Sequence, residues 1–330
     1  MLNFDTPEVE FALNAVRQAA QLVQFIQEQM VSPALTKNDR SPVTVADFAS
    51  QALIGRLLSQ TFPNDPLVAE EDSQALRDPA QEFTLDHVTA FVKRYLPEAE
   101  KGSVCDWIDH GRANTSSRFW TLDPIDGTKG FLRGDQYAVA LALVVDGQIQ
   151  IGALGCPNLS EAYRCEPQGP GSLVIAVRGQ GTWLTTIKDS GGFKSLHVSA
   201  CQDASQARIL RSVESGHTNV SQIDEFARAM GVQADPVRMD SQAKYAVLAA
   251  GKGDLILRLL SPAKPDYREK IWDQAAGALV LQEAGGRISD LHGLPLDFTT
   301  GRRLVNNRGI LASNTYLHPV ALRTLGDIGA

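Results

Sequence analysis

Acidic side chains stand in four short patches that lie far apart in the chain. The patches are Asp47, Glu70–Asp72, Asp123–Thr128 and Asp273. In the third patch, Pro124 between Asp123 and Asp126 excludes a helix interior, so the chain there is extended or turning. Two carboxylates held close together repel each other unless a cation lies between them, and Mg²⁺ prefers carboxylate and carbonyl oxygens. The third patch therefore indicates a divalent-cation site.

Each patch also has a plainer interpretation when it is taken alone. The third is then a turn with solvated acids, which explains its pattern as well as a metal site does. Asp273 is favourable at the start of a helix through the helix dipole, and Glu70–Asp72 resembles a solvated turn after a short strand. For these two patches the plainer interpretation is favoured. Because the patches occur together in one order, a cation-binding or catalytic role becomes favoured over the plainer interpretation.

The composition limits the partners of such a site. The 330 residues carry 31 basic and 38 acidic side chains, a formal net charge of −7. This balance argues against binding a nucleic-acid polymer, which needs a basic surface, but a small anionic substrate needs only a local positive pocket. The longest apolar runs, such as 138–145, are far shorter than the ~20 residues of a membrane helix, so we expect no membrane partner.

Cysteine and histidine usage excludes several other site types. The chain has no C-x-x-C pair, no H-x-x-x-H pair and none of the common glycine-rich nucleotide motifs. The N-terminal ten residues lack the basic and apolar regions of a secretory signal. We therefore expect a cytoplasmic monomer with four reduced thiols. These thiols are Cys105, Cys156, Cys165 and Cys201.

The elements that must position the acids form two different halves. Thr6 as N-cap and Pro7 predict a first helix to Met30, and a second helix is expected to begin near Asp47. Residues 137–155 form a hairpin around Asp146-Gly147, and further strands are expected at 161–165 and 173–177, which favours an antiparallel sheet.

After residue 200 helices alternate with short strands, which is typical of a second α/β unit. We expect helices at 221–230, 241–250 and 272–284 and a strand at 254–260. The domains predicted are thus 1–200, with the antiparallel sheet and most of the acids, and 201–330, with Asp273.

Three ordered motifs resemble the inositol monophosphatase superfamily of lithium-sensitive, Mg²⁺-dependent phosphatases. They are Glu70-Glu71, Asp123-Pro-Ile-Asp-Gly-Thr128 and Trp272-Asp-Gln-Ala-Ala-Gly277. Longer strings are similar to the 3'(2'),5'-bisphosphate nucleotidases of the salt-tolerance type. Those strings are 41–47, 123–140, 213–217, 241–245 and 269–273. The similarity runs from about residue 8 to 320.

The resemblance implies a fold, a reaction and a cofactor. The fold would be α/β, a layered α-β-α-β-α sandwich of the sugar-phosphatase type. The reaction would remove the 3'-phosphate from adenosine 3',5'-bisphosphate to give AMP, with activity on 3'-phosphoadenylyl sulfate as well. Two to three Mg²⁺ ions per site would be required. The site would lie where the two halves meet.

The resemblance also implies a role for individual residues. One Mg²⁺ would be held by Glu70, Asp123 and the Ile125 carbonyl, and a second by Asp123, Asp126 and Asp273. Glu70 would contact a third. Asp47 and Thr128 would pair to orient and deprotonate the attacking water. The nucleotide would be bound by His217, Ser241, Lys244 and Arg258, with Thr128 and Asp273 touching it. The stretch between Arg258 and Trp272 is longer than usual, which leaves Arg268 as an alternative to Arg258.

Two other functions stay open on the residues. An inositol mono- or bisphosphatase would share the metal site but not the adenosine contacts, and the strings at 241–245 and 129–137 weigh against it. A non-catalytic nucleotide sensor would not need an intact set of acids. Lys244 and His217, taken without the resemblance, are typical of surface positions.

Overall fold

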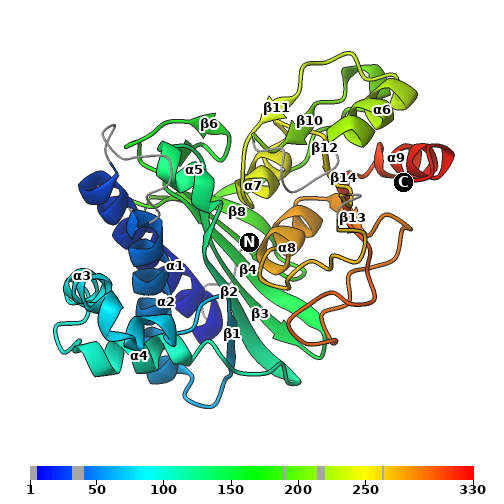
Figure 1. The fold of residues 1–330 in the computed structure, drawn as a ribbon. Helices are drawn as coiled ribbons and strands as arrows, with labels where there is room; N and C mark the ends of the chain where they lie inside the picture. Colours follow the sequence, from blue (N-terminus) through cyan, green and yellow to red (C-terminus); the bar gives the residue numbers. More distant parts are fainter. Residues whose placement is uncertain (1–5, 32–40, 189–190, 214–219, 262–263) are drawn as a thin grey trace.

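The computed structural model describes residues 6–31, 41–188, 191–213, 220–261 and 264–330 (Figure 1). The helices are α1 (Pro7–Met30), α2 (Ser41–Thr61), α3 (Glu82–Val92), α4 (Lys101–Asp109), α5 (Thr128–Arg133), α6 (Val220–Met230), α7 (Ala243–Ala249), α8 (Ala275–Glu283) and α9 (His318–Asp327). The strands are β1 (Leu67–Ala69), β2 (Arg118–Asp126), β3 (Ala138–Val145), β4 (Gln148–Cys156), β5 (Leu159–Ser160), β6 (Arg164–Cys165), β7 (Ser172–Val177), β8 (Gly181–Thr186), β9 (Lys194–Leu196), β10 (Ile209–Arg211), β11 (Val237–Arg238), β12 (Leu255–Arg258), β13 (Gly286–Ser289) and β14 (Ile310–Asn314).

The described residues form two large sheets and a two-stranded sheet of β5 and β6. The larger has seven strands in the order β1-β2-β3-β4-β7-β8-β9, and the smaller has five in the order β11-β10-β12-β14-β13. The larger sheet is antiparallel as predicted, except that β1 pairs with β2 in parallel. The smaller sheet is mixed, because β10 runs parallel to both its neighbours and β14 runs antiparallel to β12 and β13.

Helices cover both faces of both sheets, which gives five layers (Figure 1). One core joins α1 and α2 to the outer face of the larger sheet, and a second places α7 and α8 between the two sheets. A third core packs α6 and α9 on the far face of the smaller sheet. The layered α-β-α-β-α sandwich implied by the resemblance is therefore confirmed.

The continuous apolar run of β3 follows from its central position in this stack. Val139 and Leu141 belong to the core under α1 and α2, whereas Ala138 and Ala140 belong to the core under α7 and α8. A strand with a helix layer on each face buries every side chain, so its apolar residues do not alternate with polar ones. The alanines keep the second face shallow, which lets α8 lie close to the sheet.

Several predicted element boundaries were wrong. Helix α2 begins at Ser41 and not near Asp47, because Pro42 is accommodated in the first turn of a helix, where its missing N–H is not needed. The expected strand at 161–165 is interrupted, since Glu161 and Ala162 have positive φ angles of 53° and 63°. The helices expected from 241 and 272 begin at Ala243 and Ala275.

Other boundaries agree with the sequence. The first helix begins at Pro7 after Thr6, although the Thr6 side chain makes no capping hydrogen bond. The hairpin turn falls at Asp146-Gly147, and the helices α6 and α7 are followed by Gly231 and Gly251 with positive φ angles. The larger sheet ends at Leu196 and the smaller begins at Ile209, while a division into two domains at residue 200 stays a prediction.

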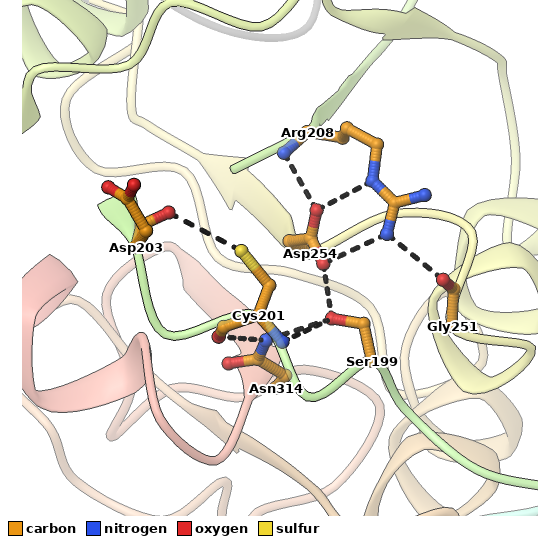
Figure 2. Close-up of polar contacts among 7 residues, drawn as sticks. All are labelled: Ser199, Cys201, Asp203, Arg208, Gly251, Asp254 and Asn314. Atoms are coloured by element: carbon orange, nitrogen blue, oxygen red, sulfur yellow. Dashed lines mark hydrogen bonds and ion pairs between the residues drawn. The ribbon is translucent and has the colours of Figure 1, made fainter. Parts of the chain in front are cut away.

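A buried carboxylate anchors the start of the smaller sheet (Figure 2). The side chain of Asp254 is 0% exposed and accepts hydrogen bonds from the Arg208 backbone N–H at 2.8 Å and from its Nε, also at 2.8 Å. The Ser199 hydroxyl donates to Asp254 and accepts from Asn314 Nδ2 at 3.0 Å. These contacts tie the chain before β10, the chain before β12 and the end of β14 together.

The four cysteines are unpaired, as predicted, with Cys105 and Cys156 buried. None of the described helices combines the length and the apolar character needed to cross a membrane.

Candidate active site

A cleft of about 390 Å³ lies between the end of β2, the start of α5 and the elements around the smaller sheet. Most of the residues predicted from the sequence line this one cleft. They are Glu70, Asp123, Ile125, Asp126, Thr128, Ser241, Lys244, Arg258 and Asp273. The structure therefore brings together acids from both halves of the chain. His217 lies outside the described residues.

Helix α2 holds two of the acidic segments from behind. The Ser50 hydroxyl donates to the Pro124 carbonyl at 3.1 Å, where the register of β2 shifts between Asp123 and Asp126. Gln51 Oε1 accepts from the Glu71 backbone N–H at 3.0 Å, and its Nε2 donates to the Glu71 carbonyl at 2.7 Å. Both side chains are 0% exposed, so these hydrogen bonds are shielded from water.

The carboxylates of the third patch leave a strand that changes register. The pairing of β2 with β3 shifts between Asp123 and Asp126, so that both residues reach the cleft although they are three positions apart. Gly127 then takes a φ of 96°, and a Cβ there would lie 2.8 Å from the Cβ of Ser241. A glycine is required both by the backbone angle and by the close approach of the second half.

Asp273 belongs to the turn that precedes α8, and Arg302 fixes that turn against the first half. The Arg302 carbonyl accepts from the Ile271 N–H at 3.2 Å, and its guanidinium lies 4.7 Å from the centre of the Trp272 ring. The same guanidinium donates to the carbonyls of Ala69 and Gly111. One arginine thus contacts the residue before Glu70 and the residue before Asp273.

The acids repel one another at close quarters. Burial raises the pKa of Asp123 and of Asp273 well above the usual range, and the surrounding carboxylates raise both further. Burial and Asp126 raise the pKa of Glu70, although Lys270 opposes this. For Glu71, burial followed by Glu70 and Asp72 raises the pKa to about 7. A set of acids that resists losing its protons in the absence of a cation is suited to binding one.

The donor set fits a hard divalent cation. Asp123 Oδ1 and Asp47 Oδ1 are buried and have no hydrogen-bond partner among the described residues, so these oxygens have capacity to accept. Among the described residues, no group of three or more His, Cys, Asp or Glu side chains is arranged to hold a metal ion as it stands. A cation bound among these acids would offset the repulsion between them.

Two cations line the opposite part of the cleft. Burial lowers the pKa of Lys244 to about 8, and its Nζ lies 3.5 Å from Ser212 Oγ. Burial alone would lower the pKa of Arg258, but Glu269, Asp273, Tyr267 and Asp126 together raise it. Arg258 Nε donates to Glu269 Oε1 at 3.0 Å. Arg268 instead donates to the carbonyls of Val305 and Tyr267 and does not line the cleft. The geometry therefore favours Arg258 over the alternative.

A buried polar chain fixes Arg258. Glu269 Oε2 accepts from Gln274 Nε2 at 3.1 Å, and Gln274 Oε1 accepts from the Tyr245 hydroxyl at 2.6 Å. Glu269, Gln274 and Tyr245 are each less than 5% exposed. The chain joins α7, the start of α8 and β12, so the position of the arginine depends on three elements.

Asp47 stands behind the cleft rather than in it. It is 5% exposed, and burial raises its pKa well above the usual range, with Glu71 and Glu70 adding to the rise. Among the described residues, no hydrogen bond joins Asp47 to Thr128, and Thr128 is the first residue of α5.

Sequence reasoning missed Gln51, Gln242, Arg302 and Lys270. Gln51 follows Asp47 by four residues on one helix, a spacing that could have indicated a shared face. Gln242 and Lys270 fall inside two of the strings that carry the resemblance. Nothing in the sequence around Arg302 marks it.

Comparison with known proteins shows the family and the fold of this chain. The model of the Inositol monophosphatase family matches residues 4–329. A 3'(2'),5'-bisphosphate nucleotidase of Schizosaccharomyces pombe is 41% identical over 94% of this chain and 92% of its own, and one of Oryza sativa is 40% identical over 97% and 94%. Among solved structures, SuhB of Mycobacterium tuberculosis has a TM-score of 0.62 at 22% identity, covering 97% of this chain and 95% of its own. An inositol monophosphatase from Anabaena has a TM-score of 0.61 at 18% identity, covering 97% of each chain.

The five layers and the acid-lined cleft between the sheets define an α/β protein of the sugar-phosphatase type. Within that class, this chain belongs to the inositol monophosphatase family, as its sequence motifs predicted.

Proposed function

We propose that this chain is a Mg²⁺-dependent phosphatase that removes the 3'-phosphate from adenosine 3',5'-bisphosphate to give AMP. We propose that it also acts on 3'-phosphoadenylyl sulfate. The observation that supports this best is the cleft itself, which is lined by the acids predicted to hold the metal and by the half-buried cations Lys244 and Arg258. The relatives that are about 40% identical over nearly the whole chain carry the name of this activity.

The acids would hold the metal in the arrangement that the sequence predicted. Glu70, Asp123 and the Ile125 carbonyl would hold one ion, Asp123, Asp126 and Asp273 a second, and Glu70 would contact a third. When bound, Mg²⁺ neutralises the phosphate, lowers the pKa of a water molecule and stabilises the leaving oxygen.

Asp47 and Thr128 would orient and deprotonate the attacking water. The buried, unpartnered Oδ1 of Asp47 has the capacity to accept a hydrogen bond, and its raised pKa makes it a stronger base than a surface aspartate. The Thr128 hydroxyl at the cleft would donate to Asp47 and align the water. In the reaction the water oxygen would bond to phosphorus as its proton passes to Asp47, the bond from phosphorus to the 3'-oxygen would break, and the leaving 3'-oxygen would take up a proton from solvent to become the 3'-hydroxyl.

The cations would recognise the phosphate that does not react. Arg258 presents a planar fork suited to phosphate oxygens, and Lys244 adds a point charge. Ser241 also lines the cleft. His217, which lies outside the described residues, would complete the nucleotide contacts that the resemblance implies. A substrate with one phosphate would use the acids but not these cations.

A phosphate-release assay tests the proposal. Purified protein with Mg²⁺ would be given adenosine 3',5'-bisphosphate, its sulfated form, adenosine 3'-monophosphate and inositol 1-phosphate, each with and without EDTA. We expect the highest kcat/KM for adenosine 3',5'-bisphosphate and its sulfated form. With EDTA we expect no phosphate release from any of the substrates. Preference for inositol 1-phosphate would indicate an inositol phosphatase instead, and binding of the nucleotide without release would indicate a sensor.

We further infer that the protein acts in the cytoplasm as a monomer on a small nucleotide, without a nucleic-acid polymer or a membrane as partner. Light scattering of the purified chain tests the monomer, and fractionation of its source cells tests the location.

A further inference from the structure

Gln242 contacts the acidic site from both halves of the molecule at once. Its backbone N–H donates to Asp126 Oδ2 at 2.7 Å. Its side-chain Nε2 donates to the Trp272 carbonyl at 2.9 Å, and its Oε1 accepts from the Gly277 N–H at 3.0 Å. Asp126 ends a strand of the larger sheet, whereas Trp272 and Gly277 flank Asp273 and the first turn of α8.

The Gln242 side chain pairs with two backbone groups near Asp273, the Trp272 carbonyl and the Gly277 N–H. Gln242 is 2% exposed, so a lost hydrogen bond there would not be replaced by water. A glutamine amide offers one donor group and one acceptor at the end of the same side chain. The Trp272 carbonyl needs the donor and the Gly277 N–H needs the acceptor, so an apolar or singly functional side chain leaves one of them unpaired.

The backbone around Gln242 is held in an unusual conformation. Ser241 has a φ of 65°, in the left-handed region that residues other than glycine rarely adopt. Such a conformation persists where the surrounding contacts over-determine it. Here it directs the N–H of Gln242 at Asp126 and brings the Cβ of Ser241 against Gly127.

We infer that Gln242 is a positioning residue that fixes the separation of Asp126 and Asp273 and thereby sets the affinity of the site for Mg²⁺. The inference rests on the proposed function in assigning Mg²⁺ to these acids. Groups that orient the ligands of a metal typically change its affinity by about 10- to 100-fold when they are removed.

The test replaces Gln242 by Met, which keeps the length of the side chain and removes both amide hydrogen bonds. Gln27→Met is the matched control. Gln27 is also buried, donates to the Phe131 carbonyl at 2.7 Å and accepts from Asn158 Nδ2 at 3.1 Å, and neither partner lines the cleft. Both variants thus lose the same kind of buried contact, but only one loses it beside the acids.

Two readouts separate positioning from general stability. Calorimetric titration with Mg²⁺ alone measures the affinity without any substrate, and thermal unfolding in EDTA measures the metal-free fold. We expect both variants to unfold at lower temperature, and Gln242→Met alone to bind Mg²⁺ about 10-fold or more weakly. Equal Mg²⁺ affinity in the two variants and the wild type would overturn the inference.

A milder variant covers the case in which Gln242→Met does not fold. Gln242→Asn keeps an amide one methylene shorter, which cannot reach both partners, and we expect a smaller loss of Mg²⁺ affinity. Wild-type affinity in a folded Gln242→Asn protein would contradict the inference. Because the titration needs no nucleotide, a wild type that binds Mg²⁺ but releases no phosphate would refute the proposed function and leave this result standing.

Discussion

His318 makes the stability of the protein depend on pH in a way that can be worked out from its contacts. It is 5% exposed and opens α9, with its Nε2 3.0 Å from Ser289 Oγ and its Nδ1 2.8 Å from Ser313 Oγ. The Ser289 hydroxyl donates to the Asp290 carbonyl, so it accepts from Nε2–H of a neutral ring. Burial lowers the pKa of His318 to about 4, and Arg287 contributes to the shift.

The sign follows from the direction of that shift. The folded protein resists protonation of His318, whereas the unfolded chain takes up a proton near the ordinary pKa of 6.5. The stabilisation is therefore complete above pH 6.5 and is lost as the pH falls toward 4. With a pKa of about 4 in the folded protein and 6.5 in the unfolded chain, linkage gives a loss in the free energy of unfolding of about 2 kcal/mol from pH 8 to pH 5.

Urea unfolding of the wild type and His318→Gln at several pH values between 8 and 5 measures this loss. Other groups titrate in the same range, so the quantity to follow is the difference in the free energy of unfolding between the wild type and His318→Gln. We expect the wild-type advantage to shrink by about 2 kcal/mol on acidification. A difference that is constant with pH would show that His318 is not held neutral, and the reasoning would fail.

Other predictions address the cleft. Asp126→Asn should reduce kcat by orders of magnitude at saturating Mg²⁺ while the melting temperature in EDTA is unchanged or higher, because one of several like charges is removed; near-normal turnover would take Asp126 out of the site. Lys244→Ala should lower kcat/KM for adenosine 3',5'-bisphosphate about 10- to 100-fold, the value of roughly 1.5–3 kcal/mol for a charged hydrogen bond, with little effect on adenosine 3'-monophosphate; an equal fall for both would assign Lys244 to the fold. Arg302→Lys loses the guanidinium fork that reaches several carbonyls and should lower the free energy of unfolding by about 1–3 kcal/mol. Arg303→Lys, at an exposed position, is the control and should not lower it. Equal stability of the two variants would contradict this role of Arg302. Millimolar Li⁺ should inhibit at limiting Mg²⁺, because it occupies a cation position with half the charge, and indifference to Li⁺ would argue against the lithium-sensitive branch.

The sequence predicted those features that depend on local chemistry. The Asp123–Thr128 patch contains its own turn residues, and the hairpin of β3 and β4 is specified by an apolar run and an Asp-Gly turn. Helix boundaries were harder, because Pro42 can precede a helix or stand in its first turn. Ser241 shows a further limit, since its positive φ delays the start of the predicted helix to Ala243 and no glycine or asparagine marks it.

The positioning residues could not be predicted because their role lies in contacts between distant segments. Gln51 pairs with Glu71, and Gln242 with Trp272, across 20 and 30 positions of the chain. A buried glutamine has no sequence signature that distinguishes it from an exposed one, and glutamine is usually exposed. Only the packing of α2 and α7 shows that these amides point inward.

The division of the acids between the two halves has a consequence for how metal and fold depend on each other. Asp126 and Glu70 belong to the first half and Asp273 to the second, so the repulsion among them acts partly across the contact between the halves. The Gln242 backbone N–H, which donates to Asp126, and the Arg302 guanidinium, which donates to the Ala69 and Gly111 carbonyls, hold that contact closed against the repulsion. A cation bound by acids from both halves would replace repulsion with attraction at the same boundary. Metal binding and docking of the halves should therefore stabilise each other. Removing the contact of Gln242 or that of the Arg302 guanidinium should weaken both metal binding and docking.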